Sequence, residues 1–205
     1  MTMITSSLQH KPSKEPNYDP AAYWERRGKG YTCHPRADEA LTMLEWLQEL
    51  QPQSILEVGA GNGWVYDQLA TIDLADRLTM CDFVHSLRQE CYQRIGILPE
   101  SWDSRTLPYA AASFDMVLTS HVLLHVPPGD IENFFAEQVR VASQWVYAAT
   151  LFSHEGKLAS HCFIHDYVGL FEQFDLVVEK ERRFPSPRRA RSKTTVHVQW
   201  LLRKG

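Results

Sequence analysis

Long apolar runs, paired cysteines and a strong charge of either sign are all missing from this chain of 205 residues. No stretch reaches the roughly 20 apolar residues that a membrane-spanning helix needs, so the sequence predicts no such helix. The N-terminus also lacks the charged-then-apolar pattern of a secretory signal. We therefore expect a cytoplasmic protein without a membrane partner.

Cysteine is scarce, and its four positions are scattered without a C-x-x-C pair: Cys33, Cys81, Cys91 and Cys162. This spacing favours reduced thiols over a disulfide framework. Zinc sites usually show a second ligand pair at recognisable spacing. Because none is visible, we expect no metal site. A formal net charge of −4 argues against a general nucleic-acid binder.

Apolar periodicity predicts alternating strands and helices. Strands are expected at 54–58, 77–81, 99–102, 114–119, 145–152, 176–180 and 194–202, and helices at 21–27, 37–50, 63–70, 84–95, 130–141 and 166–174. The alternation predicts an α/β fold with a mostly parallel sheet, helices on both faces and a C-terminal antiparallel hairpin. Residues 1–19 are expected to form a flexible lead-in, and residues 20–205 a single domain.

Three glycines follow the first expected strand at the spacing Gly59-x-Gly61-x-Gly63. A strand-to-helix turn needs glycine where the backbone has a positive φ or approaches a ligand closely. The N-terminus of the next helix then offers free N–H groups and a positive dipole end, which suits a nucleotide or a carboxylate. The spacing is one residue shorter than the G-x-G-x-x-G dinucleotide fingerprint, which disfavours a nicotinamide-dependent oxidoreductase.

The segment Ile55-Leu-Glu-Val-Gly-Ala-Gly-Asn-Gly63 resembles motif I of the class I S-adenosylmethionine (SAM)-dependent methyltransferases. Similar segments follow in that family's order: Leu78-Thr-Met-Cys-Asp82, Trp102-Asp-Ser-Arg-Thr-Leu-Pro108, Ser113-Phe-Asp-Met-Val117 and Ser120-His-Val-Leu-Leu-His125. The resemblance covers residues 20–203. It implies a Rossmann-like, seven-stranded sheet, SAM as cofactor, S-adenosylhomocysteine as product and methyl transfer as activity.

The resemblance also implies which residues hold the cofactor. Glu57 is expected to orient the loop or meet the cofactor's amino group, Asp82 to hold the ribose hydroxyls and Asp103 to receive the adenine amino group. Phe83 and Trp102 are expected to flank the adenine, although Trp102 suits core packing equally well. The expected cofactor site also includes Gly59, Gly61, Gly63, Ser104, Ser120 and Tyr23.

Residues 20–50 resemble the helices that precede the domain in many members and cover the cofactor as a lid or cap. Tyr23 suits a lid because aromatic faces attract a sulfonium cation. A surface helix held in place by Tyr23 and Trp24 is the alternative.

Methyl transfer requires alignment of the nucleophile with the methyl group, and an oxygen nucleophile must also lose a proton. His121 lies just beyond an expected strand end and is the histidine expected to approach the methyl group. His165 and Asp166 precede the penultimate helix, in a region that often lines the acceptor pocket of the family. A purely structural role for each of the three is the alternative.

Seven basic residues fall between positions 180 and 193, with Glu181 as the single acid among them: Lys180, Arg182, Arg183, Arg188, Arg189, Arg191 and Lys193. This loop is expected at the cofactor edge of the sheet, where it can attract phosphate or carboxylate. A solvated surface loop is the alternative. We therefore expect a small-molecule acceptor with an anionic group.

Two other functions stay open. One is an RNA or protein methyltransferase that docks through residues 180–193, which is less favoured because Ser120-His-Val-Leu stands where base- and amide-methylating enzymes carry an Asn-Pro-Pro-type motif. The other is a SAM-binding subunit without catalysis.

Overall fold

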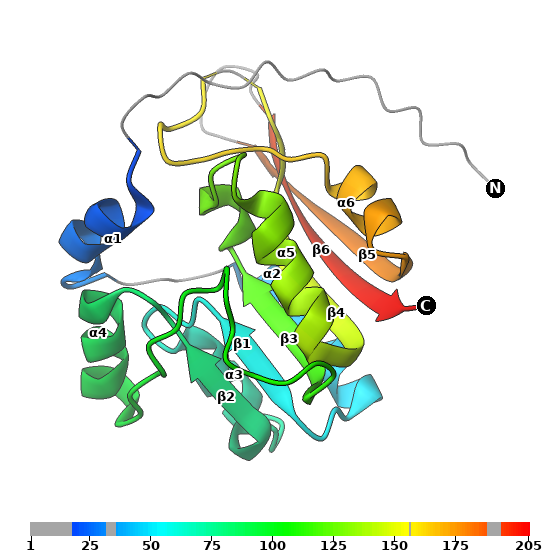
Figure 1. Ribbon diagram of the computed structural model, residues 1–205, viewed down its shortest axis with the longest axis horizontal. Helices are drawn as coiled ribbons and strands as arrows, with labels where there is room; N and C mark the ends of the chain where they lie inside the picture. Colours follow the sequence, from blue (N-terminus) through cyan, green and yellow to red (C-terminus); the bar gives the residue numbers. More distant parts are fainter. Residues whose placement is uncertain (1–17, 32–35, 156, 188–193) are drawn as a thin grey trace.

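A computed structural model describes residues 18–31, 36–155, 157–187 and 194–205 (Figure 1). Its helices are α1 (Pro20–Gly28), α2 (Ala37–Leu50), α3 (Trp64–Ala70), α4 (His85–Ile95), α5 (Ile131–Val141) and α6 (Tyr167–Gln173), with short 3-10 turns η1 (Ala75–Arg77) and η2 (Leu123–His125). Its strands are β1 (Ile55–Val58), β2 (Leu78–Cys81), β3 (Phe114–Ser120), β4 (Ala142–His154), β5 (Leu176–Pro187) and β6 (Thr194–Lys204). The predicted α/β order is confirmed.

The strands form one sheet in the order β2-β1-β3-β4-β6-β5. The first four are parallel, and β6 is antiparallel to both β4 and β5. The predicted C-terminal hairpin is therefore confirmed. Since β5 runs parallel to β4, the connection from β5 to β6 leaves the edge at which β1 to β4 end.

The described sheet has six strands, so the expectation of seven is wrong. The segment expected as the third strand reduces to one parallel bridge, Cys81↔Glu100. Glu100 donates its N–H to the Met80 carbonyl (2.9 Å) and accepts from the Asp82 N–H (3.0 Å). Pairing in this segment is limited to that one bridge.

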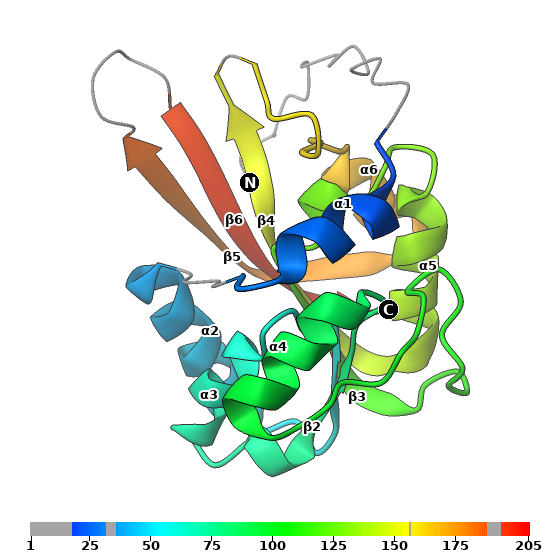
Figure 2. The same ribbon diagram turned by 90° about the vertical axis from the view of Figure 1, so that its left-hand side faces the viewer.

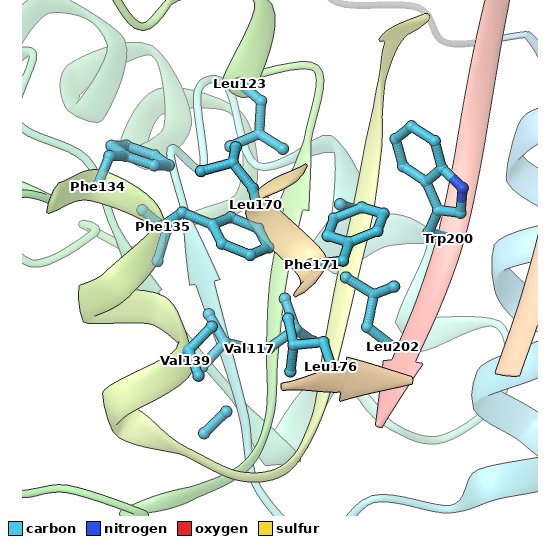
Figure 3. Close-up of a cluster of buried hydrophobic side chains, with 14 of the residues drawn as sticks. Val117, Leu123, Phe134, Phe135, Val139, Leu170, Phe171, Leu176, Trp200 and Leu202 are labelled. Atoms are coloured by element: carbon cyan, nitrogen blue, oxygen red, sulfur yellow. The ribbon is translucent and has the colours of Figure 1, made fainter. Parts of the chain in front are cut away.

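Helices cover both faces of the sheet, as predicted. On one face, α5 and α6 bury Phe134, Phe135 and Phe171 against inward-facing residues of β3, β4 and β6 (Figure 3). On the other face, α2 and α3 bury Met43, Trp46, Leu47, Val65 and Leu69. The α2 helix thus belongs to the core, whereas α1 lies against α4 (Figure 2).

The α1 helix begins and ends with clear local signals. The Asp19 side chain accepts from the Ala22 N–H (3.1 Å), and Pro20 is favoured in the first turn because its missing N–H is not needed there. Gly28 ends the helix against α4, where a Cβ would lie 2.3 Å from Ser86 Oγ. The absence of a side chain at Gly28 therefore permits the close approach of the two helices.

Two further observations bear on the predicted organisation. The β5 strand continues seven residues beyond the expected end at Lys180, because it pairs with β6 along its whole length. Among the described residues, none of the helices combines the length and apolar character that crossing a bilayer requires.

Candidate active site

A cavity of about 370 Å³ opens at the edge where β1, β2 and β3 end. Loops after these strands form its floor, and residues of α1 and Tyr31 form part of its wall. Ligands of open α/β sheets bind at this edge, outside the carboxyl ends of the strands. The cavity is therefore the natural place for a bound nucleotide.

The glycine loop connects β1 to α3 along the floor of the cavity. All three glycines have a left-handed backbone, with φ of 80°, 55° and 78°, which explains why glycine is needed. A Cβ on Gly59 would lie 2.5 Å from Val122 Cγ2, whereas one on Gly61 would meet nothing within 4 Å. Gly61 therefore leaves open space inside the cavity.

Asp82 follows β2 and is 5% exposed. Its carboxylate accepts from the Gly61 N–H (2.9 Å) and from the Val84 N–H (2.8 Å). Burial raises the pKa of this carboxyl to about 6, against the opposing effect of these hydrogen bonds. Asp82 thus links the glycine loop to the end of β2 and keeps a carboxylate at the cavity.

Glu57 is the second buried acid of the cavity, with 2% exposure. Burial, followed by the nearby Asp82 charge, raises its pKa well above the ordinary value. Its Oε2 atom is buried and has no hydrogen-bond partner among the described residues. A buried acceptor without a donor is costly, so the cavity fits a ligand that brings a cationic or N–H group to this point.

Four expected adenine-side residues also line the cavity: Phe83, Trp102, Asp103 and Ser104. Phe83 and Trp102 are 40% and 39% exposed, so both present aromatic surface to a ligand. The Asp103 carboxylate binds Arg105 Nη2 at 2.6 Å, and this hydrogen bond lowers its pKa.

Ser120 ends β3 and His121 follows it, and both line the cavity. His121 has a φ of 57° and donates its N–H to the Ala149 carbonyl (2.7 Å). Its Nε2 atom lies 2.7 Å from Oε2 of Glu39, a residue of the first turn of α2 that is 3% exposed. His197 of β6 lies next to both, with Nδ1 3.6 Å from Glu39 Oε1.

Glu39 and His197 were not predicted from the sequence. Glu39 lies 82 residues before His121 in the chain, and no spacing pattern connects the three. Burial, and then the neighbouring His121, lowers the pKa of His197.

Four predicted site residues do not line the cavity. Tyr23 stacks on His161 with ring centroids 4.5 Å apart, and a Cβ on Gly63 would meet Cys91 Sγ at 2.7 Å. His165 Nε2 lies 3.0 Å from the Leu123 carbonyl, and burial lowers its pKa. Asp166 caps α6 by accepting from the Gly169 N–H (3.0 Å).

Trp24 and His125 line the cavity instead. Their ring centroids lie 4.7 Å apart. His125 Nδ1 is 2.8 Å from the His161 carbonyl, and burial lowers the pKa of His125 to about 4. The His125 side chain is therefore uncharged at neutral pH and forms part of the cavity wall.

Residues 56–146 match a family model described as a methyltransferase domain. This match covers 91 of the 205 residues, and it is to the kind of domain that the sequence resembles. The match agrees with the resemblance found in the sequence.

Two curated proteins that carry the same name are similar to this chain. Ubiquinone biosynthesis O-methyltransferases are 27% identical over 165 residues in Albidiferax ferrireducens and 26% identical over 150 residues in Hydrogenovibrio crunogenus. These matches cover 72% and 68% of this chain and 62% and 61% of the relatives. The chain thus spans about three fifths of the length of these curated relatives.

Solved structures show the same fold. The Burkholderia thailandensis 1,6-didemethyltoxoflavin-N1-methyltransferase, with bound 1,6-didemethyltoxoflavin and S-adenosylhomocysteine, has a TM-score of 0.68 and 19% identity, covering 94% of this chain and 93% of that chain. The magnesium protoporphyrin IX methyltransferase of Synechocystis, with bound SAM, has a TM-score of 0.66 and 14% identity, covering 94% of this chain and 100% of that chain.

Proposed function

We propose that the protein transfers a methyl group from SAM to an oxygen atom of a small-molecule acceptor. The observation that carries this proposal is the cavity itself, which is lined both by Glu57, with its unpartnered carboxyl oxygen, and by His121. The similarity to proteins named O-methyltransferases supports oxygen as the accepting atom.

In this proposal, acids at two strand ends hold the cofactor. Asp82 accepts from the ribose hydroxyls, Glu57 accepts from the amino group, and Phe83 and Trp102 enclose the adenine. When bound, SAM supplies a methyl group activated by a sulfonium, so the protein mainly has to align the acceptor. His121 lies at the end of β3, where it is suited to face the acceptor oxygen.

We further propose that α1 acts as a lid over the reaction. Trp24 and Tyr31 line the cavity, and α1 is bound to α4 through the Ser86 hydroxyl, which donates to the Glu25 carbonyl (3.0 Å). A lid at this position excludes water and strengthens the electrostatic contacts inside.

The acceptor is proposed to carry an anionic group that the basic residues between positions 180 and 193 attract. The strand order supports this, because the connection from β5 to β6 leaves the sheet at the cavity edge. Two of these residues already have acidic partners, since Lys180 pairs with Glu49 and Arg183 with Glu181. Arg188, Arg189, Arg191 and Lys193 lie outside the described residues, and changing the three arginines to alanine is expected to raise KM for anionic acceptors.

Cofactor binding and methyl transfer test the proposal together. We expect calorimetry to show binding of SAM, at least tenfold weaker in Asp82→Ala and unchanged in the exposed control Asp76→Ala. A screen of phenols, catechols, carboxylic acids and RNA with labelled SAM should give a methyl ether product from a small hydroxylated compound. Equal affinity in both variants would contradict the cofactor assignment, and exclusive methylation of nitrogen or RNA would contradict the proposed acceptor.

A further inference from the structure

The cluster of Glu39, His121 and His197 has a composition that the cofactor site does not explain. Three separate elements supply it: the first turn of α2, the end of β3 and the middle of β6. One ligand-type atom from each residue lies within 4.8 Å of the other two. Two imidazoles and one carboxylate are also the donor set of three-ligand zinc sites and of facial-triad metal sites.

Two atoms of this cluster are buried and have no hydrogen-bond partner among the described residues: Glu39 Oε1 and His197 Nδ1. They lie 3.6 Å apart. Glu39 is almost fully buried, so its second oxygen is withheld from water without receiving a donor. A buried acceptor of this kind needs a partner, and a cation between the two atoms would provide one.

The neighbouring charges permit a cation at this point. Arg36 Nε lies 3.9 Å from Glu39 Oε1, but its guanidinium binds Asp38 more closely, at 2.6 and 2.9 Å. The fit to a metal requires small movements. Ligands of a tetrahedral zinc lie roughly 3.4 Å apart, given bonds of about 2.1 Å. The ligand-type atoms of the cluster, which lie within 4.8 Å of one another, must adjust to that spacing.

The cluster is also accessible. The side chains of His121 and His197 are 20% and 28% exposed, whereas the side chain of Glu39 is 3% exposed. His121 lines the cofactor cavity and His197 does not, so the cluster adjoins the cavity without occupying it.

We propose that Glu39, His121 and His197 bind a divalent transition-metal ion of the zinc class, and that this ion ligates the acceptor oxygen. The second part rests on the proposed methyl transfer. A hydroxyl that binds the ion loses its proton to solvent more easily, because the ion stabilises the oxyanion. The oxygen then forms its bond to the methyl carbon, the carbon–sulfur electron pair remains on sulfur, and the products are a methyl ether and S-adenosylhomocysteine.

Calorimetric titration of the chelator-treated full chain with zinc chloride tests the site itself. We expect one equivalent to bind, with affinity at least tenfold lower in His197→Ala and in Glu39→Gln. Two variants serve as matched controls and should bind zinc as the wild type does. His154→Ala removes another histidine next to β6, and Cys162→Ser disrupts the second cluster of ligand-type residues, His125, His161 and Cys162.

The outcomes separate the metal site from the proposed function. Retained SAM binding shows that His197→Ala is folded, and Glu39→Gln provides the second variant if it is not. The site would be overturned by any of three results. These are no saturable zinc binding in the wild type, unchanged zinc binding in both His197→Ala and Glu39→Gln, or loss of zinc binding in Cys162→Ser. Zinc binding without any methylated oxygen product would contradict the proposed function and leave the site standing. Equal methyl-transfer rates with and without zinc would overturn the acceptor role of the ion.

Discussion

Glycine is required in the loop for two reasons, a left-handed backbone and the lack of room for a side chain. Alanine variants at different glycines can measure the cost of each separately. Gly59, Gly61 and Gly96 all have a left-handed backbone, with φ of 80°, 55° and 76°. Replacement by alanine at such a φ costs about 1–2 kcal/mol. Gly61→Ala and Gly96→Ala should cost no more than this, because a Cβ at either position meets nothing within 4 Å.

Gly59→Ala should cost more. Its Cβ would lie 2.5 Å from Val122 Cγ2, and overpacking of this kind adds about 1–3 kcal/mol. The expected loss in unfolding free energy is therefore about 2–5 kcal/mol, or a decrease in Tm of about 4–20 °C for a domain of this size. The decrease for the other two variants should be about 2–8 °C by the same relation.

Cofactor affinity separates Gly61 from Gly96. Gly61 lines the cavity and Gly96 ends α4 outside it, so Gly61→Ala should weaken SAM binding at least tenfold, about 1.4 kcal/mol, whereas Gly96→Ala should not. Thermal unfolding monitored by circular dichroism and calorimetric titration with SAM provide the two measurements. The reasoning is refuted if Gly59→Ala is no less stable than Gly96→Ala, or if Gly61→Ala and Gly96→Ala bind SAM equally well.

Three further predictions follow from the site and the core. Burial raises the pKa of Asp82 to about 6, so its carboxylate protonates as the pH falls through 6. SAM affinity measured by calorimetry should therefore decrease about tenfold between pH 7.5 and pH 5. A wild-type affinity that does not change with pH would contradict this. Trp102 is partly exposed at the cavity, so SAM should change the tryptophan fluorescence of the wild type, and an identical change in Trp102→Phe would show that the indole does not meet the ligand. Tyr167→Phe removes the hydroxyl 3.1 Å from Thr150 Oγ1 in the core and should lower the unfolding free energy by about 1–3 kcal/mol; urea denaturation indistinguishable from the wild type would disagree.

The parts of the site that could be predicted from the sequence are those that follow strand ends. The glycine loop, Asp82 and His121 each come directly after an apolar strand, and parallel strands bring such positions to one edge. Apolar periodicity identified these strands because their residues are buried on both faces.

Contacts between distant segments could not be predicted in this way. Glu39 lies in the first turn of an amphipathic helix, where an acid is favourable without any site. His165 and Asp166 were predicted because the segment before the penultimate helix often lines the acceptor pocket in the family that the sequence resembles. In the structure, His165 instead bonds the Leu123 carbonyl and Asp166 caps α6. Pairing at Glu100 depends on a single bridge that leaves no periodic pattern in the sequence.

The charge of the cavity has a consequence for turnover. Among the described lining residues there is one arginine, Arg105, and there are five acids: Asp19, Glu57, Asp82, Asp103 and Asp130. A sulfonium carries a positive charge that the thioether product lacks, so methyl transfer removes part of the attraction between this lining and the cofactor. In the proposed reaction, the same acids that favour binding of the donor would favour departure of the product, and the exchange of one for the other would be driven in part by electrostatics.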